Sequence, residues 1–195
     1  AQYQSVIDKY NLTRIDFDIE GTMLGNTTAT DRRNKAIAAL QAAAASAGKT
    51  LTVQFTLPVL PSGLTSQGIS LLQNAISNGV NIGLVNVMAM DYGSSFDPNQ
   101  MGTNAVNAMN ATISQVKTLY GAAKTDAQAR SMVGVTVMIG LNDVSPEVFT
   151  LADASTLLSA AQSGGVGFLS FWSTSRDQQC SGSPTISSNC SGVTQ

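Results

Sequence analysis

The sequence predicts an α/β fold in which parallel strands alternate with helices, and three observations support this prediction. Five short segments rich in β-branched and aromatic residues alternate with four helix-like segments, each long enough for a parallel crossover. The strand-like segments contain apolar runs, as in strands that helices cover on both faces. Polar residues gather where these segments end. Two architectures fit this pattern: an open, doubly wound sheet and part of a (β/α)8 barrel.

The positions of the elements follow from composition and turn signals along the chain. Strands are predicted over residues 12–20, 51–57, 81–90, 132–140 and 166–172, the second of them ended by Pro58 and Pro61. Helices are predicted over residues 31–48, 67–78, 102–121 and 146–162.

Capping and apolar residues support the helix boundaries. Asp31 and Ser66 are expected to cap the first two helices. Gly48 is expected to end the first helix, and Pro146 lies near the start of the last, where proline is tolerated. Apolar residues mark one face of each middle helix: Ile69, Leu72 and Ile76, and then Val106, Met109, Ile113, Val116 and Tyr120.

Two features favour the barrel over the open sheet. No glycine-rich phosphate loop follows any strand, which counts against a nucleotide-binding sheet. The carboxyl ends of the strands, where the polar residues gather, are the place where barrel enzymes hold their sites. A whole barrel has eight strands in typically about 250 residues, whereas this chain of 195 residues supplies five. We therefore expect residues 1–195 to be part of one domain, with about three βα units missing upstream through truncation or processing, or supplied by another chain.

The composition excludes several kinds of chemistry. The chain has no histidine, which excludes a Ser-His-Asp triad, a Cys-His pair and a His-ligated zinc site. Proton transfer would therefore fall to carboxyl or phenol groups. The net charge of −2 offers no basic surface for nucleic acid or an anionic membrane, and no apolar run is long enough for a membrane span. We expect no nucleic-acid partner, membrane, metal or cofactor.

The two cysteines, Cys180 and Cys190, flank a segment near the C-terminus that is rich in Ser, Gly, Pro and Thr. We expect them to form a disulfide that closes a small loop rather than to remain two unrelated thiols. A disulfide indicates an oxidising compartment. Together with a charged fraction of only 11%, it favours a secreted, extracellular protein.

The first strand carries the sharpest chemical signal. Side chains alternate along a strand, so Asp16, Asp18 and Glu20 should share one face. Three acids on one face of a buried strand are costly unless a site uses them, and their repulsion should hold a proton on at least one of them to higher pH. A solvated edge strand and a Ca²⁺ or Mg²⁺ site are the alternatives. Metal loops usually carry glycine and polar spacers, whereas the spacers here are Phe17 and Ile19.

This segment resembles a signature of chitinases of glycoside hydrolase family 18. That signature, Asp-Gly-x-Asp-x-Asp-x-Glu, lies on the fourth strand of their (β/α)8 barrel. Asp16, Asp18 and Glu20 match its last three acids. Thr13 and Arg14 stand where the pattern has its first Asp and its Gly, a departure outside the catalytic trio.

Later segments resemble the same family in the same order. Asp91 lies in a segment like the sixth-strand Met-x-Tyr-Asp, although Met90 takes the place of the Tyr and Tyr92 follows the Asp. Residues 136–143 are similar to the seventh strand. Trp172 resembles the eighth-strand Trp that forms the floor of the −1 sugar site. The resemblance implies that the five strands are strands four to eight of the barrel.

The resemblance implies a retaining, substrate-assisted chitinase that acts on chitin or N-acetylglucosamine oligosaccharides. Glu20 would protonate the glycosidic oxygen, Asp18 would orient the acetamido group, and Asp16 would tune Asp18 by sharing a proton. Further residues expected to contact substrate are Asp91, Tyr92, Trp172, Met88 and Gln54, of which Met88 and Trp172 also fit simple core packing. Gln54 is expected to reach sugar hydroxyls because of its position on the second strand.

Three other functions remain open. An endo-β-N-acetylglucosaminidase acting on glycoprotein glycans shares the acidic motif and the barrel. A non-catalytic chitin-binding lectin has the same fold, but such proteins often lose the acid, and Glu20 is present. An inactive half-barrel could fold through self-association or with a complementary fragment.

Overall fold

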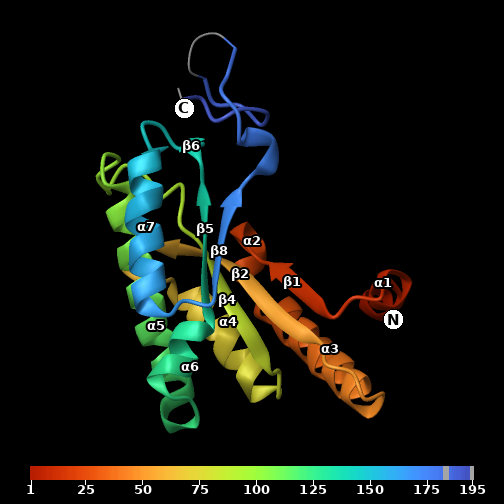
Figure 1. Cartoon of the computed structure of the whole chain (residues 1–195). Helices are drawn as coiled ribbons and strands as arrows, with labels where there is room; N and C mark the ends of the chain where they lie inside the picture. The colour runs from red at the N-terminus through yellow and green to blue at the C-terminus, as the bar shows by residue number, and fades with distance from the viewer. Residues whose placement is uncertain (182–184, 194–195) are drawn as a thin grey trace. The chain divides into compact units, whose positions relative to one another are not determined.

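The computed structural model describes residues 1–181 and 185–193. It has an α/β fold in which the long strands pair in parallel, consistent with part of a (β/α)8 barrel (Figure 1). Hydrogen bonds order the long strands as β1-β2-β4-β5-β8, so β1 and β8 are the end strands. The chain divides into two compact units, which are Ala1–Leu57 with Thr65–Val85 (unit 1) and Pro58–Leu64 with Asn86–Gln195 (unit 2).

The elements alternate along both units. Unit 1 contains α1 (Gln2–Tyr10), β1 (Arg14–Asp18), α2 (Gly21–Leu24), α3 (Thr27–Ser46), the first part of β2 (Thr52–Leu60), α4 (Ser66–Ser77) and the first part of β4 (Ile82–Met88). Unit 2 contains the ends of β2 and β4, with β3 (Gly63–Leu64), α5 (Met101–Tyr120), η1 (Gly121–Ala123), α6 (Asp126–Ser131), β5 (Val133–Met138), β6 (Gly140–Leu141), β7 (Val148–Phe149), α7 (Leu151–Gly164), β8 (Phe168–Trp172) and η2 (Thr174–Arg176). Within the described residues, no helix combines the length and apolar character needed to cross a bilayer.

All five predicted strands are present, and the second is longer than expected. Pro58 and Pro61 were expected to end it at residue 57, but β2 continues to Leu60 and turns back through an antiparallel pairing with β3. The pairs there are Val59 with Leu64 and Leu60 with Gly63, so Pro58 is not one of the residues that β3 pairs. A proline is tolerated in a strand where its missing N–H is not needed for the ladder.

Two helices are capped by residues other than those expected. In α3, the side chain of Asn26 accepts a hydrogen bond from Ala29 N at 3.0 Å, and the helix begins at Thr27. In α4, Thr65 Oγ1 accepts from Gly68 N at 3.3 Å, one residue before the expected cap Ser66. Asn, Ser, Thr and Asp all make good caps, so several candidates close together in the sequence compete.

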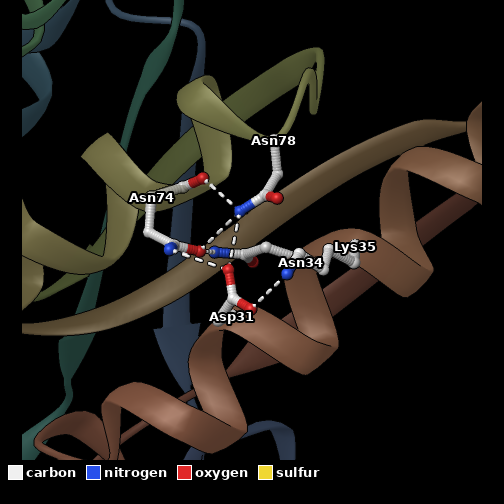
Figure 2. A network of polar contacts seen from close by, with 5 residues as sticks. All are labelled: Asp31, Asn34, Lys35, Asn74 and Asn78. Carbon is white, nitrogen blue, oxygen red and sulfur yellow. Dashed lines mark hydrogen bonds and ion pairs between the residues drawn. The ribbon is translucent and has the colours of Figure 1, made fainter.

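Asp31 lies inside α3, where it belongs to a polar network between α3 and α4 (Figure 2). Its carboxylate pairs with Lys35 at 2.7 Å and accepts hydrogen bonds from the side-chain amides of Asn74 and Asn78, each at 3.2 Å. Asn34, which is fully buried, donates to Asn74 Oδ1 at 2.9 Å. The contacts with Lys35, and then those with the two amides, hold the pKa of Asp31 below its ordinary value.

The last predicted helix begins later than expected. Residues 146–150 are not helical: Pro146 follows a cis peptide bond, and β7 pairs antiparallel with β6. The helix α7 starts at Leu151 because Thr150 and Asp153 form a capping box, in which each side chain accepts from the other's backbone N–H. The short elements α2, α6, β3, β6 and β7 were not predicted.

Asp153 also joins α7 to α5, and these two helices lie side by side in unit 2 (Figure 1). Its carboxylate accepts a hydrogen bond from Gly102 N at 2.8 Å. A Cβ atom at Gly102 would lie 2.7 Å from Asp153 Cα, so only glycine fits this close approach. Strand β5, which packs against α5, contributes fully buried side chains, including those of Val133 and Val135.

The predicted disulfide between Cys180 and Cys190 is present, and residues 182–184 of its loop lie outside the described residues. The neighbouring Arg176, which is 1% exposed, donates to the carbonyl oxygens of Ile139 at 3.0 Å and Leu141 at 2.5 Å, and also to that of Ser187. Burial lowers the pKa of Arg176, but an arginine keeps its charge at any physiological pH. This buried cation therefore ties the C-terminal segment to the chain that follows β5.

We predict that Thr150→Ala lowers the stability of the protein by about 1 kcal/mol, because it removes the N-cap of α7. The matched control is Thr156→Ala on the same helix, where the side chain is exposed and bonds only to the carbonyl of Ala152. That variant should change stability by less than about 0.5 kcal/mol. Urea denaturation measures both, and equal losses in the two variants would contradict the capping role.

Candidate active site

The acidic residues of β1 alternate with apolar ones as predicted. Asp16, Asp18 and Glu20 are exposed, whereas Phe17 is half-buried and Ile19 is 3% exposed. Among the described residues, β1 ends the hydrogen-bonded strand order, with its acidic side exposed and its apolar side packed inward.

Aromatic contacts fix the inward side of β1. The ring of Phe17 packs against Phe55 of β2 at a centroid distance of 5.9 Å and against Tyr3 of α1 at 5.3 Å, edge to face. Phe55 is fully buried. Because side chains alternate, anchoring Phe17 inward sets the direction of the acids on either side of it.

Strand β2 places polar groups next to the acids. The parallel register sets Asp16 opposite Gln54 and Asp18 opposite Thr56. Thr56 Oγ1 donates a hydrogen bond of 2.8 Å to Asp16 Oδ2, and Ile19 N donates to the carbonyl of Thr56 at 3.0 Å. Gln54 is 7% exposed, and its Oε1 has no hydrogen-bond partner in the part of the chain that the structure describes.

The pKa of Asp18 is raised above its ordinary value. Loss of solvation contributes most, followed by the negative charges of Glu20 and then Asp16. The charges of the two neighbouring acids thus act in the predicted direction, but they contribute less than the loss of solvation. Glu20 lies just beyond the strand in extended backbone, with φ −142° and ψ 180°, and its side chain does not cap the helix α2 that follows.

A second group of polar residues, in unit 2, follows the end of β4. Met88, the last residue of that strand, is half-buried. Asp91 adopts the left-handed conformation with φ 51°, which Asp tolerates better than most residues. Its N–H donates to Asn142 Oδ1 at 3.3 Å, and its Oδ1 accepts from Val144 N at 2.9 Å. The loop after β5 thus holds the turn that carries Asp91.

Tyr92 points into unit 2 rather than into solvent. It is 6% exposed, its ring lies 5.9 Å from that of Phe96, and its hydroxyl is buried without a hydrogen-bond partner among the described residues. Burial and the nearby Glu147 raise the pKa of Tyr92 well above its ordinary value. Of the residues expected to bind substrate, Tyr92 therefore presents less surface than Asp91 or Trp172.

Glu147 belongs to this group and was not identified from the sequence. It is 2% exposed, and its carboxylate accepts hydrogen bonds from Tyr92 N at 3.2 Å and Gly93 N at 2.8 Å. Burial raises the pKa of Glu147, against the opposing effect of these two N–H groups. The sequence placed this residue near the start of a helix, where an acid is ordinary, so no signal distinguished it.

Trp172 ends β8 and is 58% exposed. It pairs with Met138 of β5, and its carbonyl accepts from Ile139 N at 3.1 Å. The peptide bond between Trp172 and Ser173 is cis. The exposed indole offers an apolar face, so this tryptophan does not pack in the core of unit 2.

The structure thus brings Asp16, Asp18, Glu20 and Gln54 together in unit 1, and in unit 2 it holds Asp91 and Tyr92 in one turn that follows Met88 and the end of β4. Among residues 1–181 and 185–193, no three His, Cys, Asp or Glu side chains are grouped so as to hold a metal ion. Grouped carboxylates of which one has a raised pKa can serve as a proton donor and as a stabiliser of positive charge.

Two curated proteins have sequences similar to this chain, although no protein-family model matches it. The chain is 40% identical over 182 residues to a probable bifunctional chitinase/lysozyme of Escherichia coli (strain K12), covering 90% of this chain and 20% of that protein. It is equally 40% identical over 182 residues to Endochitinase 11 of Metarhizium anisopliae, covering 90% of this chain and 35% of that protein. The chain therefore spans a fifth to about a third of the curated relatives it matches.

Solved structures agree with these matches. The catalytic domain of a hyperthermophilic chitinase from Pyrococcus furiosus superposes with a TM-score of 0.86 at 33% identity, over 99% of this chain and 59% of that chain. Catalytic-site mutants of active domain 2 of a thermostable chitinase from the same organism, complexed with chito-oligosaccharides, give a TM-score of 0.85 at 32% identity. Over nearly its whole length the chain is thus related to chitinase catalytic domains, and the family 18 chitinase resemblance that its acidic motif predicted is confirmed.

Proposed function

We propose that the protein carrying this chain is a chitinase that hydrolyses β-1,4 linkages between N-acetylglucosamine units by a retaining, substrate-assisted mechanism. One observation carries the proposal: Asp16 and Asp18 on β1 and Glu20 just beyond its end are all exposed, in the order of the chitinase signature. The names of both curated relatives and the chito-oligosaccharide complexes of the Pyrococcus furiosus chitinase support the same substrate class.

Glu20 is the proposed general acid. It would give its proton to the glycosidic oxygen as the bond to the leaving sugar breaks. Its exposure and its position past the end of β1 support this role, because a donor must reach the oxygen between two sugars. The bond is then replaced by one from the substrate itself: the carbonyl oxygen of the N-acetyl group attacks the anomeric carbon and forms an oxazolinium ion.

Asp18 would stabilise that ion by accepting a hydrogen bond from the acetamido N–H. Its raised pKa supports a group that can hold or share a proton with its neighbour Asp16. Asp16 is fixed by the hydroxyl of Thr56 at 2.8 Å, which supports its role in orienting Asp18. Water, deprotonated by Glu20, would open the oxazolinium ion with retention of configuration.

The remaining substrate contacts are proposed from the family pattern. Asp91 would hold the acetamido group, whereas the buried Tyr92 offers little surface for the contact expected of it, and Trp172 would give an apolar face to the sugar ring, which its 58% exposure supports. Gln54 would turn its Oε1, which has no hydrogen-bond partner among the described residues, toward a sugar hydroxyl. Met88 would line the site with its half-buried side chain.

We further propose that residues 1–195 are a portion of one catalytic domain and supply strands four to eight of its barrel. The match to 59% of a solved chitinase catalytic-domain chain supports this assignment. The disulfide between Cys180 and Cys190 supports an oxidising, extracellular location. Comparing turnover of chitin oligomers with release of N-glycans separates a chitinase from an endo-β-N-acetylglucosaminidase.

We predict that Glu20→Gln in the full-length protein lowers kcat on N-acetylglucosamine oligomers by about 10²- to 10⁴-fold, the usual contribution of a general acid. Oligomer affinity, measured by calorimetry, should change less than about threefold, because the amide keeps the shape of the side chain. The control Asp8→Asn removes an exposed carboxylate of α1 in the same unit and should leave kcat unchanged. Near-normal turnover by Glu20→Gln would remove Glu20 from this role.

We predict that Asp18→Asn lowers activity but raises stability at neutral pH. Because its folded-state pKa is raised, ionised Asp18 costs stability as the pH rises from its unfolded pKa of about 4 through the folded value. The cost should be at most about 1 kcal/mol, since the side chain is exposed. Urea unfolding at pH 4 and pH 7 should show a gain only at the higher pH.

The opposite-sign control for this experiment is Asp31→Asn. The pKa of Asp31 is lowered, so its ionised form stabilises the folded state and the variant should be less stable than wild type at pH 7. An Asp18→Asn variant that also loses stability at pH 7 would contradict the proposed repulsion among the acids.

A further inference from the structure

Glu147 is a buried carboxylate that the proposed reaction does not use. It is 2% exposed, and in the part of the chain that the structure describes no Lys or Arg forms an ion pair with it. Burying an ionisable carboxyl without a cation is costly, so the structure around it has to compensate. The compensation is a pair of backbone N–H groups, those of Tyr92 and Gly93, one on each carboxylate oxygen.

These bonds are part of a lattice between two segments of unit 2, residues 91–93 and residues 142–147. In the second segment, Asn142 Oδ1 accepts from the backbone N–H of Asp91, and the backbone N–H of Val144 donates to the Asp91 carboxylate. The Glu147 carboxylate accepts from the backbone N–H groups of the two residues after Asp91. Four hydrogen bonds therefore fix three consecutive residues. Gly93 has φ +93°, a backbone conformation that glycine adopts more readily than other residues. Because the glycine backbone is free to adopt several conformations, we infer that the hydrogen bonds select the one seen here.

The segment that carries Glu147 is itself anchored to β5. The backbone N–H of Glu147 donates to Val144 O at 3.0 Å, and its carbonyl accepts from Asn142 N at 3.0 Å. The side-chain amide of Asn142 donates to the carbonyls of Met138 at 2.9 Å and Gly140 at 3.2 Å. The carboxylate thus extends from a rigid strand end to the turn that carries Asp91.

We propose that Glu147 is a positioning residue for the hydrolysis: by accepting both N–H groups it fixes the turn and so sets the orientation of Asp91 toward the acetamido group. This inference rests on the proposed function of Asp91. A carboxylate is required because it offers two acceptor oxygens, whereas a glutamine amide offers one acceptor and would turn a donor toward the second N–H.

The test is Glu147→Gln in the full-length protein. A misplaced contact group should lower kcat on N-acetylglucosamine oligomers by about 10- to 100-fold, with KM changed less than about threefold. Affinity for a thiazoline analogue of the oxazolinium ion should fall with kcat, whereas affinity for the oligomer should not. Faster hydrogen–deuterium exchange at Tyr92 and Gly93 gives a readout that does not depend on activity.

The matched control is Thr112→Val, a shape-conserving change at a fully buried residue of α5 in the same unit. It should leave kcat, KM and analogue affinity unchanged. If Glu147→Gln does not fold, Glu147→Asp decides instead: its shorter carboxylate cannot span both N–H groups, so kcat should fall by at least about threefold.

Unchanged kcat and analogue affinity in the folded variant would overturn the positioning role, whatever the exchange rates. Equal losses of oligomer and analogue affinity, with kcat unchanged, would also overturn it and leave a purely structural role. A wild-type protein that cleaves no chitin oligomer would instead overturn the proposed function, and the positioning role with it. In that case the exchange rates still show whether Glu147 holds the turn.

Discussion

The crowding of carboxylates on β1 is the constraint on which the rest of the site depends. Asp16 and Asp18 lie on the same side of one short strand with Glu20 just beyond its end, and loss of solvation, followed by the charges of Glu20 and Asp16, raises the pKa of Asp18. The fold tolerates this because the opposite side of the strand is anchored by Phe17 against Phe55, and because Thr56 satisfies Asp16. Apolar packing on one face thus supports a destabilising arrangement on the other, as is common where a protein holds reactive groups.

The two groups of polar residues are built in different ways. The acids of unit 1 are exposed and held mainly by strand alternation and register. The residues of unit 2 are held by buried and part-buried hydrogen bonds, in which Glu147 and Asn142 bond to the backbone of a neighbouring turn. Exposed carboxylates suit proton transfer with a substrate, whereas a buried, fully bonded carboxylate suits the fixing of geometry.

Most of the fold could be predicted from the chain alone, because long elements have strong periodic signals. Strands β4, β5 and β8 and the helix α5 lie within a few residues of their predicted bounds. The errors fell at element ends and in short elements. Asp31 was a reasonable cap by residue type, yet Asn26 caps α3 and Asp31 meets Asn74 and Asn78, which lie more than forty residues along the chain. Contacts at that sequence separation leave no local pattern to read.

The sequence by itself determined the alternation of acidic and apolar residues along β1, since an acid at every second position of a strand needs only local geometry to form one face. It likewise predicted the disulfide between Cys180 and Cys190, which the structure contains. Only the tertiary structure decided which side of β1 is solvated, that Tyr92 is buried, and that Glu147 supports the turn after Asp91. Burial and long-range hydrogen bonds depend on which distant segments pack together, and that is a property of the folded chain rather than of any stretch of its residues.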